Sequence, residues 1–212
     1  IELNPANGVA CVWYSIVLFT ERRFEEGLEL ARRGIELDPL TPFNHHNLGW
    51  GLYFAGRYDE AAEQYEKVIQ TFPDYSFGYL GLSKVNRLIG RTKEALEQVK
   101  IGNRLMGESL FSRLAEAESY AADGQVEVAR EKLDEILKLS DDRFVSPYQV
   151  ALVYAVLGDR DRAIEYLEQA SANNEAWLNW MGVDPVLDPL RSDDRFEFIL
   201  EQTGYRPFFS SF

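Results

Sequence analysis

The sequence predicts an all-α solenoid in which pairs of antiparallel helices stack on one another. The first observation is a period of 34 residues, marked by Gly56, Gly90, Gly124 and Gly158 at one position of the repeat. The second is that each copy holds two stretches of about 12–14 residues with apolar positions at i, i+3, i+4 and i+7, as in amphipathic helices. One such pair cannot bury its own apolar face, whereas stacked pairs can.

Five copies without insertion cover residues 8–177, as 8–41, 42–75, 76–109, 110–143 and 144–177. Five residues after the glycine the copies carry Ala61, Ala95, Ala129 and Ala163. Seven residues before it the side chain is small, at Ser15, Gly49, Ser83, Ala117 and Ala151. Small side chains at these positions let the two helices of a pair approach closely.

The second copy shows the expected elements. Its two helices are predicted at about residues 43–55 and 58–71. Gly56, between them, can adopt the left-handed conformation that closes a helix. Pro73 follows the second helix, where proline cannot continue the hydrogen-bond ladder; Pro5 and Pro39 occupy the same position.

The chain is expected to begin inside a repeat. Residues 1–5 resemble residues 35–39, so residues 1–7 are predicted to be the tail of a truncated upstream repeat in a longer protein. Residues 9–19 are an apolar run that reaches about 16 Å as a helix, roughly half of a bilayer core, so no membrane span is expected. A preceding repeat would bury this helix on both sides; without one, self-association through it is expected.

Residues 178–212 are predicted to form a C-terminal cap. Pro185 and Pro189 prevent a full first helix of a sixth repeat. Ser192 is the expected N-cap of a final helix that ends at Gly204. Its first turn is acidic and its apolar stripe faces the last repeat, with Asp193, Asp194, Phe196, Ile199 and Leu200 in these positions.

Composition excludes several classes of protein. The net charge of −13 disfavours nucleic acid as a partner, and 46% hydrophobic residues exclude a disordered chain. The single cysteine, Cys11, excludes an internal disulfide framework and a cysteine-rich zinc site. It fits a reducing compartment, so a cytoplasmic location is expected.

The sequence shows no pattern of catalytic residues. His45 and His46, the two histidines, are adjacent and would point about 100° apart on a helix, which is poor geometry for a shared metal. Paired carboxylates such as Asp141 and Asp142 are expected to be solvated or to complement helix ends. We therefore expect no enzyme activity, no cofactor and no metal site.

The second copy resembles the tetratricopeptide repeat family. The matching residues are Asn47, Leu48, Gly49, Leu52, Gly56, Arg57, Tyr58, Ala61, Tyr65 and Pro73. The fifth copy is also close, with Ala151, Tyr154, Gly158, Ala163, Leu167 and Ala170, whereas the first, third and fourth depart from the pattern at Arg22 in the glycine column, at Asn86 and at Glu116. The resemblance implies a right-handed superhelix of five such helix pairs plus the capping helix. It also implies a non-catalytic scaffold for protein–protein interaction, whose first helices line a concave groove.

By that resemblance the partner-binding residues are Phe43, His46, Trp50, Tyr53, Phe77, Leu80, Lys84 and Arg87. Trp and Tyr are typical of binding hot spots, so the expected ligand is a peptide or helix with apolar anchors and an acidic residue near Lys84 and Arg87. A small molecule in the aromatic groove is the alternative ligand. A chaperone adaptor is disfavoured, because Leu80 and Leu114 replace polar residues of the family's carboxylate clamp.

A second resemblance concerns the stretch 183–196. It is similar to a terminal segment that follows such repeats in bacterial multidomain signalling proteins. This similarity implies an alternative function, that of a C-terminal regulatory domain. The effector, a winged-helix DNA-binding domain, a nucleotide cyclase or a Ser/Thr kinase, would then lie upstream.

Overall fold

The computed structural model describes residues 7–140 and 142–203, and all regular secondary structure within them is helical. Five consecutive helix pairs form the array. They are α1 (Gly8–Thr20) with α2 (Phe24–Leu37), α3 (Pro42–Phe54) with α4 (Tyr58–Thr71), α5 (Ser76–Leu88) with α6 (Thr92–Leu105), α7 (Leu110–Ala122) with α8 (Val126–Leu137), and α9 (Pro147–Val156) with α10 (Arg160–Ala172). The predicted fold class is confirmed. The boundaries assigned to the five repeats stay a prediction.

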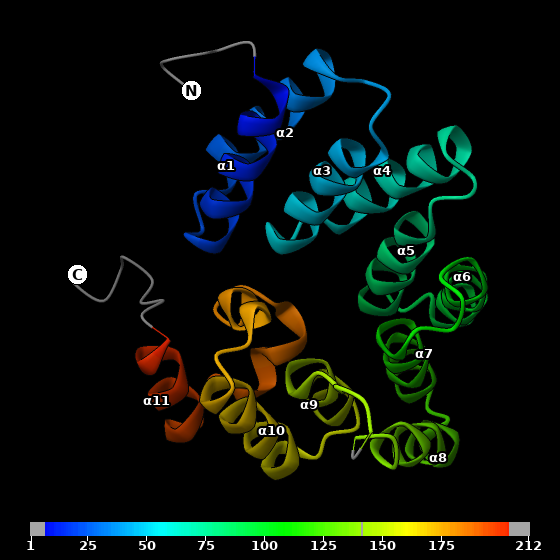
Figure 1. The fold of residues 1–212 in the computed structure, drawn as a ribbon, viewed down its shortest axis with the longest axis vertical. Coiled ribbons are helices and arrows are strands. Elements are labelled where there is room, and N and C mark those ends of the chain that lie inside the picture. The colour runs from blue at the N-terminus through cyan, green and yellow to red at the C-terminus, as the bar shows by residue number, and fades with distance from the viewer. Residues whose placement is uncertain (1–6, 141, 204–212) are drawn as a thin grey trace.

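The pairs stack in sequence. Each first helix contacts the next first helix, from α1 to α3, α5, α7 and α9, and each second helix contacts the first helix of the following pair up to α7. The pairs follow one another round an open ring, with α1 and α11 near its two ends (Figure 1). Nearest-neighbour stacking of this kind is what stabilises a solenoid.

The glycine column closes the first helix of each pair. Gly56, Gly90, Gly124 and Gly158 have φ between 74° and 78°. Glycine adopts this left-handed conformation without the steric cost that a Cβ adds. Arg22 stands in the same column and takes the same conformation, with φ of 61°. The backbone geometry of the repeat is therefore kept where its usual residue is missing.

Small residues make room for large rings at the helix crossings. A Cβ added at Gly49 would lie 2.9 Å from the ring of Tyr65, and one at Gly81 only 2.3 Å from it. Tyr65 is thus held between its own pair and the next. Gly51 likewise makes room for the ring of Phe19 from the first pair, because a Cβ added at Gly51 would lie 2.2 Å from that ring.

The chain leaves the repeat pattern after α10. Two 3₁₀-helices, η1 (Ala176–Trp180) and η2 (Pro185–Leu190), replace a sixth first helix. Residues 176–190, here called the return segment, lie inside the ring and are coloured orange in Figure 1. The sequence predicts a cap here, but it does not predict that this segment turns into the hollow of the array.

The last described helix, α11 (Asp194–Gln202), packs against α10 and buries Phe196 and Ile199. The prediction of Ser192 as its N-cap is wrong. Asp193 is the N-cap, because it holds the extended conformation at the helix start, with φ of −96° and ψ of 126°, and accepts a hydrogen bond from the Arg195 N–H. The predicted helix end at Gly204 and the upstream tail before residue 7 lie outside the described residues, as does Asp141.

The first helix has a bare apolar side. Val9, Trp13, Tyr14 and Val17 are exposed, with between 44% and 64% of each residue's surface accessible. The opposite side, with Cys11, Val12 and Leu18, is buried. Among the described residues no helix is both long and apolar enough to cross a bilayer.

Candidate binding groove

A cavity of about 250 Å³ lies on the concave side of the array. Residues of the first helices α3, α5, α7 and α9 line it, and the return segment contributes a further wall. The lining includes all eight residues that the sequence predicts for partner binding, namely Phe43, His46, Trp50, Tyr53, Phe77, Leu80, Lys84 and Arg87. The structure therefore brings these residues together, and their role in binding stays a prediction.

The 34-residue period explains why the lining is coherent. Phe43, Phe77 and Phe111 occupy the same repeat position on successive first helices, and all three line the cavity. The rings of Phe77 and Phe111 have centroids 6.1 Å apart. Because equivalent residues of stacked pairs face the same way, one aromatic position in the repeat becomes a continuous aromatic strip.

His46 lies at the centre of this aromatic wall. Its ring is within 6.2 Å, centroid to centroid, of the rings of Phe43, Trp50, Tyr65, Tyr75 and Phe77. Burial lowers the pKa of His46 to about 4, against an opposing contribution from the Phe77 backbone. The imidazole is therefore neutral near pH 7 and serves as one more flat ring. Burial also raises the pKa of Tyr75 to about 12 and that of Tyr65 further, so both phenols stay protonated.

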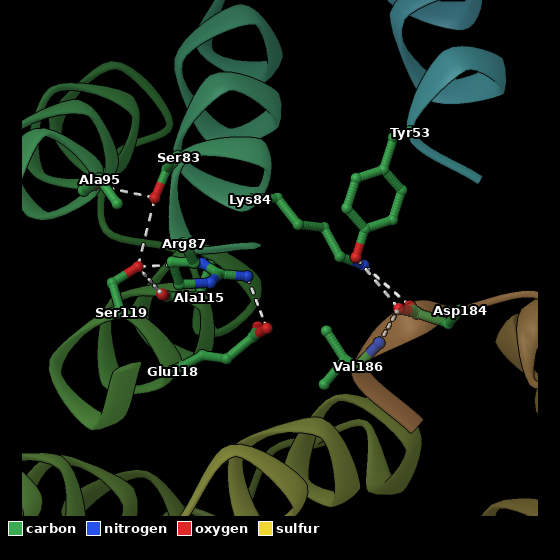
Figure 2. Close-up of polar contacts among 10 residues, drawn as sticks. All are labelled: Tyr53, Ser83, Lys84, Arg87, Ala95, Ala115, Glu118, Ser119, Asp184 and Val186. Carbon is green, nitrogen blue, oxygen red and sulfur yellow. Dashed lines mark hydrogen bonds and ion pairs between the residues drawn. The ribbon is translucent and has the colours of Figure 1, made fainter. Parts of the chain in front are cut away.

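The other end of the cavity is polar, and its charges are paired. Asp184 of the return segment is 1% exposed, and its Oδ1 accepts hydrogen bonds of 3.1 Å from the Tyr53 hydroxyl and from the backbone N–H of Val186. The other carboxylate oxygen, Oδ2, lies 2.9 Å from Lys84 Nζ (Figure 2). Burial and then the nearby Asp184 raise the pKa of Tyr53, which keeps its hydroxyl a hydrogen-bond donor.

Arg87 belongs to a second buried network beside the first. Its guanidinium lies 2.5 Å from Glu118 Oε1 and donates to the Ser119 hydroxyl at 2.9 Å. The Ser83 hydroxyl joins the network and donates to the Ala95 carbonyl oxygen (Figure 2). Carboxylates of this chain therefore already pair with Lys84 and Arg87. An acidic ligand residue near these two cations stays a prediction, and it would have to compete with Asp184 or Glu118.

The return segment supplies two rings that the sequence analysis did not place in the groove. Trp180 stacks on Trp50 with ring centroids 4.3 Å apart and on Phe54 at 4.5 Å. Trp177 stacks on Phe111 at 5.9 Å. Two tryptophans three residues apart, at the point where the repeat pattern breaks, were the available sign that this segment needs an aromatic surface.

The cavity is lined mostly by aromatic rings, and its charged side chains are paired. No group of three or more potential metal ligands occurs within residues 7–140 and 142–203. Large rings around a hollow with paired charges at one end offer contact area for an apolar group. His45, the other histidine, packs against Phe72 and bonds the Pro39 carbonyl oxygen, and it does not line the cavity.

The comparisons with known proteins agree with this geometry. The family model for the tetratricopeptide repeat matches residues 42–75, and a second model of the same family matches residues 148–176. These two stretches match tetratricopeptide repeats (TPRs), and the fold of the chain is that of solved TPR solenoids. No curated protein matches its sequence. The similarity of the C-terminal segment to the end caps of bacterial signalling proteins stays a prediction.

Solved TPR structures share the fold at low sequence identity. A thermophilic TPR protein of Thermus thermophilus matches with a TM-score of 0.66 and 21% identity over 92% of this chain and 99% of that chain. Cut9–Hcn1, a hetero-tetramer of the APC/C, matches at 0.65 and 15% identity over 98% of this chain and 42% of that one. YrrB, described as a TPR protein with an unusual peptide-binding site, matches with a TM-score of 0.51 and 18% identity over 86% of this chain and 94% of that chain.

Proposed function

We propose that this protein is a non-catalytic protein–protein interaction scaffold that holds a peptide or helix in its concave groove. The single observation that carries the proposal is the aromatic lining of that groove by equivalent positions of successive first helices. Tryptophan and tyrosine give large contact areas at low entropic cost, as at binding hot spots. A structural relative, YrrB, is itself described as having a peptide-binding site.

The size of the cavity favours a side-chain anchor over a cofactor-sized ligand. Its volume of about 250 Å³ lies below the roughly 300–1,000 Å³ of typical small-molecule sites. One bulky apolar side chain of a partner fits that space, while the rest of the partner would contact the exposed rim. Phe77, which is 38% exposed, lies at this rim.

The proposal extends to the partners and the location. Nucleic acid and membranes are not proposed as partners, given the net charge of −13. A cytoplasmic location fits the single cysteine, Cys11, which is buried as a free thiol. The alternative, a C-terminal regulatory domain that follows an effector domain in a longer chain, gains no support from the matched proteins.

Selection of peptides on the intact protein tests the proposal. Peptides from a random displayed library that bind the wild-type chain should lose about 2 kcal/mol or more of binding free energy in Phe77→Ala, because a hot-spot ring is removed from the rim. Phe144→Ala is the matched control, since Phe144 is 72% exposed and does not line the cavity. Binding that survives Phe77→Ala, or that depends equally on Phe144, would contradict a groove site.

A further inference from the structure

The return segment places in the groove the same two groups that we expect in a partner, an aromatic anchor and a carboxylate. The sequence predicts a ligand with apolar anchors and an acidic residue near Lys84. In the structure Trp180 supplies an anchor, stacked on Trp50 and Phe54, and Asp184 supplies the carboxylate on Lys84 and Tyr53. Both groups come from one stretch of this chain, four residues apart.

These contacts join parts of the chain that stacking alone would not bring together. Tyr53 is 131 residues from Asp184, and Lys84 is 100 residues from it. Arg22 adds a hydrogen bond from its guanidinium to the Gly182 carbonyl oxygen. The segment therefore reaches from the last pair across the hollow to the first three pairs.

The return segment has two sides with different attachments. The 3₁₀-helix η2 contacts α9, η1 contacts α10, and Leu187 and Leu190 are fully buried. Trp180 and Asp184 instead face α3 and α5, as Figure 2 shows for Asp184, which points toward Tyr53 and Lys84. Loss of the contacts to α3 and α5 leaves the segment anchored on the last pair and frees the surface of α3 and α5.

We propose that the return segment is a built-in ligand of the groove, and that the external partner is a peptide with an aromatic residue followed four residues later by a carboxylate. Such a peptide competes with Trp180 and Asp184 for Trp50, Phe54, Tyr53 and Lys84. The groove is then closed in the free protein and opens when the partner takes the place of the segment. This inference rests on the proposed function, because it names the partner and the regulation of the same groove.

A peptide of residues 176–190 with a fluorescent label provides the probe. Its anisotropy is measured with the intact chain and with the full-length double variant Trp180→Ala/Asp184→Asn. The peptide should bind the double variant at least about tenfold more tightly than the intact chain, because the variant has lost the competing groups. Asp188→Asn is the matched control, since Asp188 is an exposed carboxylate of the same segment that pairs with Arg191, and it should behave like the intact chain.

Two results would overturn the inference. One is equal affinity, or no affinity, for the intact chain and the double variant; the other is a peptide that keeps its affinity when it carries the same Trp180→Ala and Asp184→Asn changes. If the double variant fails to fold by circular dichroism, the single variant Asp184→Asn, which keeps the shape of the side chain, replaces it with the same criteria. If binding of the displayed peptides depends on Phe77 but the 176–190 peptide does not bind as expected, the proposed function stands and only this inference is removed.

Discussion

Lys84 Nζ lies 2.9 Å from Asp184 Oδ2, and this ion pair ties the third helix pair to the segment that follows the fifth. Lys84 also lies over the ring of Tyr53, 5.0 Å from its centroid. The carboxylate is almost fully enclosed, whereas the side chain of Lys84 keeps 23% of its surface exposed. A few contacts that are distant in sequence thus hold the return segment against the first helices of the array.

Lys84→Met should lower the free energy of unfolding by about 2–4 kcal/mol, because it leaves a buried carboxylate without its charge partner. Urea denaturation measures this change. The double variant Lys84→Met/Asp184→Asn should recover part of the loss, since it removes the unpaired charge. Arg33→Met, which breaks the exposed Arg33–Glu36 pair, is the control and should change little. If Lys84→Met and Arg33→Met lower the free energy of unfolding equally, the Lys84–Asp184 pair is not a buried, structural ion pair.

Gly90→Ala and Gly81→Ala should both destabilise the protein, for different reasons. Gly90 has φ of 78° and open space around the added Cβ, so the cost is backbone strain of about 1–2 kcal/mol. Gly81 lies in α5, where alanine would otherwise help the helix, and the cost comes from the Tyr65 ring at 2.3 Å. Thermal unfolding of Gly81→Ala combined with Tyr65→Leu should show less than the sum of the two single losses. Strict additivity there would refute the steric explanation.

The stability of the protein should fall as the pH is lowered from about 6.5 to about 4. The folded-state pKa of His46 is about 4, below the 6.5 of the free side chain, because the ring is buried. Between these two pH values His46 is protonated in the unfolded chain and neutral in the folded chain. The free energy of unfolding therefore rises with pH by up to about 1.4 kcal/mol per pH unit.

Urea denaturation across that pH range measures the contribution of His46. His46→Phe should flatten the pH dependence, since phenylalanine does not titrate and keeps a ring among the surrounding aromatic side chains. His45→Gln, a change at the adjacent histidine that does not line the cavity, is the control. An unchanged slope in His46→Phe would show that other groups cause the acid sensitivity.

The bare side of α1 should make the chain self-associate. Trp13 and Val17 are 60% and 46% exposed and lie on one apolar surface. Light scattering over a concentration series should show a rising average mass for the wild type and a constant monomer mass for Trp13→Glu. Phe198→Glu, at an exposed site on α11, is the control and should behave like the wild type. A wild-type chain that stays monomeric throughout would disprove this prediction.

The repeat geometry could be predicted from the sequence because it is local and periodic. A glycine every 34 residues marks the left-handed residue that ends each first helix, and the structure confirms this at Gly56, Gly90, Gly124 and Gly158. The aromatic residues of the groove were predicted by the resemblance to a known repeat, which implies the side of each pair that faces inward. Both inferences need only contacts within one copy or between neighbouring copies.

The closure of the groove could not be predicted in this way. It depends on contacts such as that of Tyr53 with Asp184, 131 residues apart, which no periodic pattern encodes. The Asp184–Pro185 step indicated where the helical pattern stops, but a break in a pattern does not say where the chain goes next. The burial of Trp180 and Asp184 is a property of the whole ring, and so are the contact of Trp177 with Phe111 and the pairing of Lys84.

Hydrogen exchange of the intact chain with a selected peptide tests the central claim most directly. The account predicts slower exchange of amides in Pro42–Phe54 and Ser76–Leu88, two of the first helices that line the groove. Protection confined to the outer helices α4 and α6 would place the bound peptide elsewhere and contradict the concave face as the binding surface.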